Sequence, residues 1–258
     1  MEFKNKVALI TGATGSIGKE IARRIVQEGG KSFITDLEQA KVDTVVKEIG
    51  SSCRGLAADV TKLDAVAGAV NVCRQTFGGN IDVLINVAGT SGKGSKIEDI
   101  TEADWDFVYA VNVKGTFFFI KEVLPIMKAQ GSGAIVNFSS KSGKTGSALM
   151  SAYSSAKGAV ITLTQAVAYE TAKLGIRVNC VCPGITEATG VWTHVSADYV
   201  NNMNMPMEDI VKTFVAKVPM GRLAHIEDIV NAACFLASDR AAYMTGQAVN
   251  VTGGREMH

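Results

Sequence analysis

Residues 6–30, KVALITGATGSIGKEIARRIVQEGG, decide the fold of this chain. They begin with a short apolar run that contains β-branched residues, which is typical of a buried strand. A glycine-rich turn follows at once, and after it the apolar residues at 17, 21, 22, 25 and 26 recur at helical spacing. The stretch therefore predicts a strand, a tight turn and an amphipathic helix in immediate succession.

The same alternation continues along the chain. Each predicted strand is a continuous apolar run, which indicates a parallel sheet covered on both faces by helices. Further strands are predicted at 31–36, 53–60, 81–89, 133–139, 176–182 and 247–254, with helices at 37–50, 62–79, 101–130, 151–172 and 226–238. No linker or repeat divides the chain, so we expect an α/β fold in which residues 1–258 form one doubly wound domain around a seven-stranded parallel sheet.

Length and composition limit the function. A chain of 258 residues with 47% hydrophobic residues suits a single large α/β domain. The formal net charge of +1 argues against a nucleic-acid or membrane-surface partner that relies on a basic face. No apolar stretch reaches the ~18 residues of a membrane span, and the start, MEFKNKVALITG, lacks a signal-peptide core. We expect a cytoplasmic protein with a small-molecule substrate.

The cysteines and histidines do not suggest a metal site. The five cysteines form no C-x-x-C pair, and Cys180 and Cys182 lie two apart in an apolar run. We expect small, buried, reduced side chains. The three histidines, His194, His225 and His258, have no spacing typical of zinc ligands. We predict no catalytic metal.

The turn Thr11–Gly18, TGATGSIG, joins the first predicted strand to the first helix. Glycines there let backbone N–H groups approach a pyrophosphate at the positive end of the helix, although the spacing is not G-x-G-x-x-G. Asp36 ends the second strand, where a carboxylate accepts ribose hydroxyls and repels a 2′-phosphate. With Leu37 rather than a basic residue next, NAD is favoured over NADP. The alternative role for Asp36 is to cap a helix starting at Glu38.

Tyr153 and Lys157 lie four residues apart in the predicted helix 151–172, so their side chains share one helical face. An ammonium beside a phenol favours phenolate and lowers the phenol pKa towards neutrality. Ser140 ends the apolar run AIVNFSS, thirteen residues before Tyr153. The combination indicates proton transfer on an alcohol or carbonyl, whereas the Tyr-Lys spacing alone also occurs by chance on amphipathic helices.

Together these motifs resemble the short-chain dehydrogenase/reductase family, from about Lys6 to Gly254. TGATGSIG is similar to its TGxxxGxG turn, except that Ser16 stands where a glycine is usual. The other matching motifs are Asp59-Val60, Asn86-Val87-Ala88-Gly89, Asn112 in VNVKG, the trio Ser140, Tyr153 and Lys157, and Pro183-Gly184.

The resemblance implies hydride transfer between NAD and a secondary alcohol or its ketone. It implies catalytic roles for Asn112, Ser140, Tyr153 and Lys157: Tyr153 moves the proton, Lys157 lowers its pKa and binds the ribose, Ser140 holds the substrate oxygen, and Asn112 kinks the long helix and holds a water. The implied cofactor-binding residues are Gly12, Thr14, Gly15, Ser16, Ile17, Gly18, Asp36, Leu37, Asp59, Val60, Asn86, Ala88, Gly89, Tyr153, Lys157, Pro183, Gly184, Ile185 and Thr186, with Thr189 as the alternative to Thr186 for the nicotinamide carboxamide.

The long segment 185–218 interrupts the rhythm and predicts a lid over the site. Side chains in it that could line an apolar pocket, or instead pack the lid onto the body, are Trp192, His194, Tyr199, Met203, Met205 and Met207. The ending YMTGQAVNVTGG and the segment 142–157 resemble acetoin, butanediol and polyol dehydrogenases, which implies a small polar alcohol. The alternatives are a 3-oxoacyl thioester reductase, a hydroxysteroid dehydrogenase, or a non-catalytic dinucleotide-binding protein.

Four lysines, Lys93, Lys96, Lys141 and Lys144, fall on loops expected around the pocket mouth. They are either simply solvated or, if two converge, binders of a sulfonate, phosphate or carboxylate on the substrate. The candidate substrate residues are accordingly Ser140, Lys141, Ser142, Lys144, Tyr153 and Trp192.

The helices predicted at 101–130 and 151–174 are apolar over more than one face. Such helices suit burial against another subunit. We therefore expect a homotetramer, with a dimer as the alternative.

Overall fold

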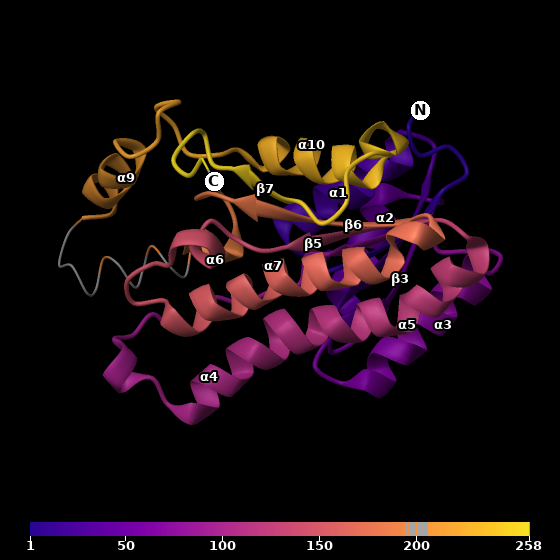
Figure 1. The fold of residues 1–258 in the computed structure, drawn as a ribbon, viewed down its shortest axis with the longest axis horizontal. Helices are drawn as coiled ribbons and strands as arrows, with labels where there is room; N and C mark the ends of the chain where they lie inside the picture. Colours follow the sequence, from indigo (N-terminus) through magenta and orange to yellow (C-terminus); the bar gives the residue numbers. More distant parts are fainter. Residues whose placement is uncertain (194–195, 197–199, 201–205, 258) are drawn as a thin grey trace.

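The computed structural model describes residues 1–193, 196, 200 and 206–257 (Figure 1). Its sheet has seven strands, all parallel, in the order β3-β2-β1-β4-β5-β6-β7. The strands are β1 (Val7–Thr11), β2 (Lys31–Asp36), β3 (Cys53–Ala57), β4 (Val83–Asn86), β5 (Gly133–Phe138), β6 (Ile176–Pro183) and β7 (Ala248–Val251). The predicted doubly wound α/β fold is confirmed.

Helices alternate with these strands along the chain. They are α1 (Ser16–Gln27), α2 (Gln39–Ile49), α3 (Leu63–Phe77), α4 (Glu102–Tyr109), α5 (Gly115–Gln130), α6 (Ser142–Thr145), α7 (Ser151–Thr171), α9 (Met207–Val215) and α10 (Ile226–Ala237). A π-helical turn at Ala110–Lys114 joins α4 to α5, so the long helix predicted at 101–130 is one helical region with a local widening.

Two apolar cores cover the two faces of the sheet. One face packs against α1, α2 and α10, and the other against α3, α5 and α7 (Figure 1). On α1, the side chains of Ile21, Ala22 and Ile25 are fully buried, which explains the helical spacing of apolar residues in that stretch. Each large aliphatic side chain buried in this way contributes about 1.5–3 kcal/mol, so the helix is held by its apolar face.

Parallel strands bring all their carboxyl ends to one edge of the sheet. The chain leaves β1 towards β2 on one side, whereas β4 lies on the other side of β1, and ligands of such sheets bind at this reversal. Helices α6 and α9 and the start of α7 lie at the same end of the molecule (Figure 1). The fold thus places the glycine turn and the Ser140–Lys157 region along one edge.

The five cysteines are free and buried, as expected. Burial raises the pKa of Cys53, Cys73 and Cys234 to about 12, so these thiols stay protonated. None of the described helices combines the length and apolar character needed to span a bilayer. Exposed aromatic side chains on α4, α5 and α7 (Phe107, Phe117 and Tyr169) suit the predicted contact with other subunits, which stays a prediction.

Candidate active site

The turn between β1 and α1 packs so tightly against the protein backbone that two of its positions have no space for a side chain. Gly12 has φ +64°, and a Cβ there would lie 2.7 Å from the backbone of Ala88; a Cβ on Gly18 would lie 2.6 Å from the carbonyl oxygen of Gly12. Both positions therefore require glycine. Gly15 is the N-cap of α1, and no side chain caps the helix or places an acidic group in its first turn. The helix N-terminus suits a phosphate group.

Asp36, at the carboxyl end of β2, faces this turn. Its Oδ2 accepts hydrogen bonds from the Thr14 amide at 2.9 Å and the Thr14 hydroxyl at 2.6 Å, and its Oδ1 accepts from the Leu37 amide at 2.8 Å. The helix α2 starts at Gln39 with Glu38 as its N-cap, so the alternative role of Asp36 as the cap is wrong. The carboxylate is instead held beside the glycine turn, where the ribose of a dinucleotide would lie.

Ser16 has a contact that a glycine at this position could not make. Its hydroxyl donates to the carbonyl oxygen of Ala188 at 3.0 Å. Ala188 belongs to the lid segment and adopts a left-handed backbone with φ 56°. The departure from the family's turn therefore ties the turn to the lid.

Two other predicted cofactor residues, Asp59 and Asn86, make hydrogen bonds that fix the chain at or just after the carboxyl ends of β3 and β4. Asp59 Oδ1 accepts from the amide and hydroxyl of Thr61 at 2.9 and 2.7 Å. The buried amide of Asn86 donates to Asn137 at 2.9 Å, and Asn137 donates to Thr164 at the same distance. The Asn86 side chain thus joins β4 to β5 and α7, and it is not in the wall of the cavity described next.

The predicted trio comes together on one cavity of about 610 Å³. Ser140 lies two residues beyond the end of β5, and Tyr153 and Lys157 lie in the first two turns of α7. Tyr153 and Lys157 are 7% and 4% exposed. The Ser142 amide donates to Ser140 Oγ at 3.1 Å, which orients that hydroxyl. Two hydroxyls and an ammonium therefore line one cavity.

Lys157 is fixed by the backbone of β5. Its Nζ donates to the Phe138 carbonyl oxygen at 2.8 Å and lies 5.7 Å from the centroid of the Tyr153 ring. Burial lowers the pKa of Lys157 to about 8. The ammonium is thus a buried cation whose position is set by a strand rather than by a carboxylate.

The expected lowering of the Tyr153 pKa is not found in the structure. Burial raises the pKa of Tyr153 to about 12, and a hydrogen bond with Ser140 opposes this rise without reversing it. The reason is geometric, because Lys157 directs its hydrogen bond to Phe138 rather than to the phenol. Tyr153 is therefore a neutral phenol near pH 7, which is the form that donates a proton.

Asn112 is fully buried at the centre of the π-helical turn, as the predicted kink requires. Its side-chain nitrogen donates to the carbonyl oxygens of Thr90 and Val108, both at 2.8 Å, and its side-chain oxygen accepts from the Thr90 amide at 3.3 Å. Asn112 therefore fixes the loop that follows β4. It does not line the cavity, and its predicted role in holding a water stays a prediction.

The cavity runs from the trio to the lid. Ile17, Gly89, Pro183, Gly184 and Ile185 line it, as does Ser142. Both candidate threonines, Thr186 and Thr189, line it too, so both alternatives remain. Trp192 is in the wall and meets Phe214 edge-on at 5.9 Å between ring centroids. His194, Tyr199, Met203 and Met205 lie outside the described residues, and Met207 is 41% exposed.

Of the four loop lysines, only Lys141 lines the cavity. The Nζ of Lys144 donates to the Ala248 carbonyl oxygen at 2.8 Å and thereby fastens α6 to β7. Lys93 and Lys96 are exposed and absent from the cavity wall. The assignment of Lys144 to the substrate site is corrected here, because a backbone acceptor holds its ammonium elsewhere.

The cavity wall also contains residues that the sequence did not single out. They are Ile210, Thr213, Phe214 and Lys217 from the lid and Arg255 from the C-terminal tail. Arg255 could have been noticed in the sequence because it directly follows Gly253-Gly254, but nothing in the local pattern shows that this tail returns to the cavity. Among the described residues, no group of histidine, cysteine and acidic side chains is arranged to hold a metal ion.

Comparison with known proteins agrees with this geometry. The sequence profile described as enoyl-(acyl carrier protein) reductase matches residues 12–256. This chain belongs to the short-chain dehydrogenase/reductase family. It is 38% identical over 255 residues to 2-(S)-hydroxypropyl-CoM dehydrogenase 3 of Xanthobacter autotrophicus, covering 98% of this chain and 97% of that one.

Two solved structures of this family are similar throughout. An NAD⁺-bound xylitol dehydrogenase has a TM-score of 0.94 at 32% identity, covering 98% of this short-chain dehydrogenase/reductase and all of the other chain. A variant actinorhodin polyketide ketoreductase with NADPH has a TM-score of 0.93 at 34% identity, covering 98% of both chains. Membership shows an oxidoreductase of alcohols and ketones, and these two structures contain NAD⁺ and NADPH, respectively.

Proposed function

We propose that this protein is an NAD-dependent dehydrogenase that interconverts a small polar secondary alcohol and its ketone. The observation that carries the proposal is the shared cavity, in which the hydroxyls of Ser140 and Tyr153 and the ammonium of Lys157 face one space beside Pro183 and Gly184. Two relatives are named for hydroxylated small molecules, a hydroxypropyl-CoM and xylitol. Their names support a polar alcohol as the substrate.

The residues present fit a dinucleotide. Gly12 and Gly18 allow the turn to pack tightly against the protein backbone, the N-terminus of α1 suits the pyrophosphate, and Asp36 suits the adenosine ribose. Bound there, NAD⁺ would accept the hydride from the carbinol carbon in oxidation, and NADH would supply it to the carbonyl carbon in reduction. Asp36 favours NAD because a second negative charge, the 2′-phosphate of NADP, would meet its carboxylate.

The protein's own residues would manage the proton. In reduction, the neutral phenol of Tyr153 donates its proton to the carbonyl oxygen, while Ser140 donates a hydrogen bond to the same oxygen and stabilises the charge that develops on it. In oxidation the proton returns to Tyr153 Oη, which must then be a phenolate. Lys157 is the cation placed on the same helical face to stabilise that phenolate.

The proposal is tested by measuring turnover of a panel of polyols, acyloins and hydroxy acids with NAD and NADP in parallel. Wild-type enzyme should prefer NAD, and Asp36→Ala combined with Leu37→Arg should lower kcat/KM for NAD about 10–100-fold, since hydrogen bonds to a charged group are lost. The same variant should gain activity with NADP.

Glu38→Gln is the matched control, because it removes the neighbouring carboxylate, which forms an exposed ion pair with Lys41. It should leave the cofactor preference within about twofold of wild type. Equal use of NAD and NADP by the wild-type enzyme, or no turnover across the panel, would contradict the proposal.

A further inference from the structure

A cluster of positive side chains forms one wall of the catalytic cavity. Lys141 comes from the loop after β5, Lys217 follows α9, and Arg255 follows β7. The three residues are far apart in the sequence, so only the tertiary structure brings them together. None of them is required by the proton transfer described above.

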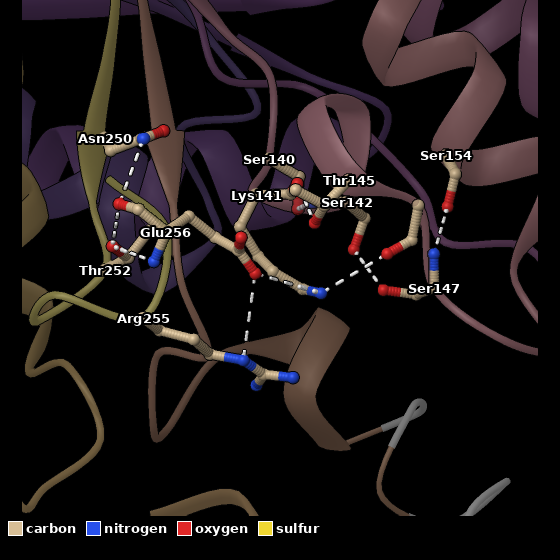
Figure 2. A network of polar contacts seen from close by, with 11 residues as sticks. Ser140, Lys141, Ser142, Thr145, Ser147, Ser154, Asn250, Thr252, Arg255 and Glu256 are labelled. Carbon is tan, nitrogen blue, oxygen red and sulfur yellow. Dashed lines mark hydrogen bonds and ion pairs between the residues drawn. The ribbon is translucent and has the colours of Figure 1, made fainter. Parts of the chain in front are cut away.

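Glu256 is the carboxylate that this cluster contacts. Figure 2 shows it between the Lys141 ammonium and the Arg255 guanidinium, with N···O distances of 3.8 and 4.0 Å. Charge-assisted hydrogen bonds are about 2.7–2.9 Å, so neither contact is a close one. The backbone of Glu256 is fixed by Thr252, whose hydroxyl accepts from the Glu256 amide at 3.2 Å and donates to its carbonyl oxygen at 3.1 Å. The carboxylate is thus held near both cations at ion-pair distance only.

The wall therefore has more positive than negative charge in a partly buried place. The side chains of Lys141 and Arg255 are 11% and 14% exposed. Burial lowers the pKa of Lys141, and the positive charges of Arg255 and Lys217 lower it further, while Glu256 acts in the opposite direction. Among the described residues, Glu256 is the carboxylate beside Lys141 and Arg255, and the mutual repulsion of the three cations leaves the site favourable to an added anion.

Arg255 also has unused hydrogen-bonding capacity. Its Nη1 is buried and has no hydrogen-bond partner among the described residues, and its guanidinium lies 5.4 Å from the centroid of the Phe214 ring. Lys217 Nζ lies 5.7 Å from the same centroid. One aromatic side chain therefore holds both cations at the cavity wall, and a guanidinium with a free donor is suited to an oxyanion.

We propose that Lys141, Lys217 and Arg255 form an anion subsite, and that the substrate is a hydroxy or keto compound bearing a carboxylate, sulfonate or phosphate. The proposal rests on the proposed alcohol and ketone chemistry. Lys141 directly follows Ser140, so the subsite adjoins the residues that hold the reacting oxygen. The anion would fix the end of the substrate that does not react. Lys141 and Arg255 follow β5 and β7, whereas the glycine turn follows β1 and Asp36 ends β2, so the subsite and the place predicted for the phosphates of the cofactor belong to different strand ends of the sheet.

Matched substrate pairs test the subsite. The pairs are β-hydroxybutyrate with β-hydroxybutyramide, and 2-hydroxypropanesulfonate with its sulfonamide, each assayed with NAD on wild type, Lys217→Met and Arg255→Met. Loss of one charged hydrogen bond corresponds to about 10–100-fold. The ratio of kcat/KM for the anion to that for its neutral partner should fall by this factor in both variants, through a higher KM for the anion.

Lys212→Met is the matched control. Lys212 lies on α9, is 74% exposed in its side chain, pairs with Asp209 and does not line the cavity. Its substitution removes the same charge from the lid and should leave the ratio within about twofold of wild type. A wild-type enzyme that prefers the neutral partners, or variants that lose activity equally on both members of each pair, would overturn the subsite.

Calorimetric titration separates failure of the subsite from failure of the proposed function. β-Hydroxybutyrate and its amide are titrated into the enzyme with and without NADH, where no turnover occurs. Binding of the anion that is at least about tenfold tighter than that of the amide, and that is lost in Arg255→Met, supports the subsite even if no panel compound is oxidised. Turnover of neutral alcohols without tighter anion binding overturns the subsite and leaves the proposed function standing.

Discussion

The two ends of the catalytic cavity are built differently. The trio end, Ser140, Tyr153 and Lys157, is attached to the sheet: Lys157 Nζ donates to the Phe138 carbonyl oxygen at 2.8 Å, and the Lys157 carbonyl oxygen accepts from Ser139 Oγ at 2.7 Å. The lid end, with Phe214, Lys217 and Arg255, consists of side chains on a lid and a tail, joined by ring contacts. Lys217 is exposed, whereas Lys157 is 4% exposed.

This difference suggests a division of labour. Proton transfer needs fixed geometry, and a strand end with a packed helix supplies it. Substrate choice tolerates variation, and loops on a rigid scaffold supply that. Changes at the trio end should therefore affect all substrates alike, and changes at the lid end should affect one class of substrate more than another.

The largest expected effect is at the trio end. Tyr153→Phe removes the proton donor and keeps the ring, so kcat should fall about 10²–10⁴-fold for anionic and neutral substrates alike, with NADH affinity little changed. Tyr169→Phe is the control, since Tyr169 lies on the same helix and is 90% exposed. Steady-state rates and fluorescence titration with NADH measure both quantities. Near-normal turnover by Tyr153→Phe would contradict the assignment of proton transfer to the trio end.

The second effect is on stability and tests how firmly Lys157 is buried. Its pKa is about 8 in the folded protein, compared with 10.5 ordinarily. Between these pH values the unfolded chain binds more protons than the folded one, so stability rises with pH. The contribution of Lys157 is therefore fully present above pH 10.5 and is lost as the pH falls through about 8.

Urea denaturation of wild type and Lys157→Met from pH 7.5 to 10.5 measures this contribution. Other titrating groups are common to both proteins, so the difference in their free energies of unfolding isolates Lys157. The difference should move in favour of wild type by up to about 3 kcal/mol as the pH rises. A flat difference would mean that Lys157 is as accessible to water as the lid cations, and the comparison would fail.

The smallest expected effect tests which lysines near the lid end of the cavity contact the substrate. Lys144→Met removes a lysine near the site whose ammonium binds the Ala248 carbonyl oxygen and does not face the cavity. Stability should fall by about 1 kcal/mol through the lost hydrogen bond, while the anion-to-neutral selectivity stays within about twofold of wild type. A selective loss of anion turnover, measured with the β-hydroxybutyrate pair, would show that Lys144 belongs to the subsite.

Local pattern was sufficient for the fold. The seven strands and the helices between them follow from continuous apolar runs and from helical spacing such as that of Ile21, Ala22 and Ile25, because burial of these faces determines the layers. The trio was also predictable, since Tyr153 and Lys157 share a helical face and parallel strands bring Ser140 to the same edge. These are short-range consequences of sequence.

Two electrostatic expectations failed because they depended on partners that local spacing does not reveal. Lys157 was expected to lower the pKa of Tyr153, but in the structure its Nζ donates to the Phe138 carbonyl oxygen and burial raises that pKa to about 12. Lys144 was a candidate for the substrate site, with solvation as the alternative, but its ammonium donates to the Ala248 carbonyl oxygen in β7. In both cases the ammonium donates to a backbone carbonyl oxygen that a distant segment of the chain supplies.

The sequence by itself determined the parallel sheet, the glycine turn with Asp36 nearby, and the Ser140, Tyr153 and Lys157 trio. Only the tertiary structure decided which charges meet in the cavity, because Lys141, Lys217 and Arg255 come from three distant segments. The physical reason is the difference in sequence range between the two effects. The periodic burial of a helix or strand is encoded within a few residues, whereas the electrostatic field at a site sums the charges of every chain segment that folding brings within a few ångströms.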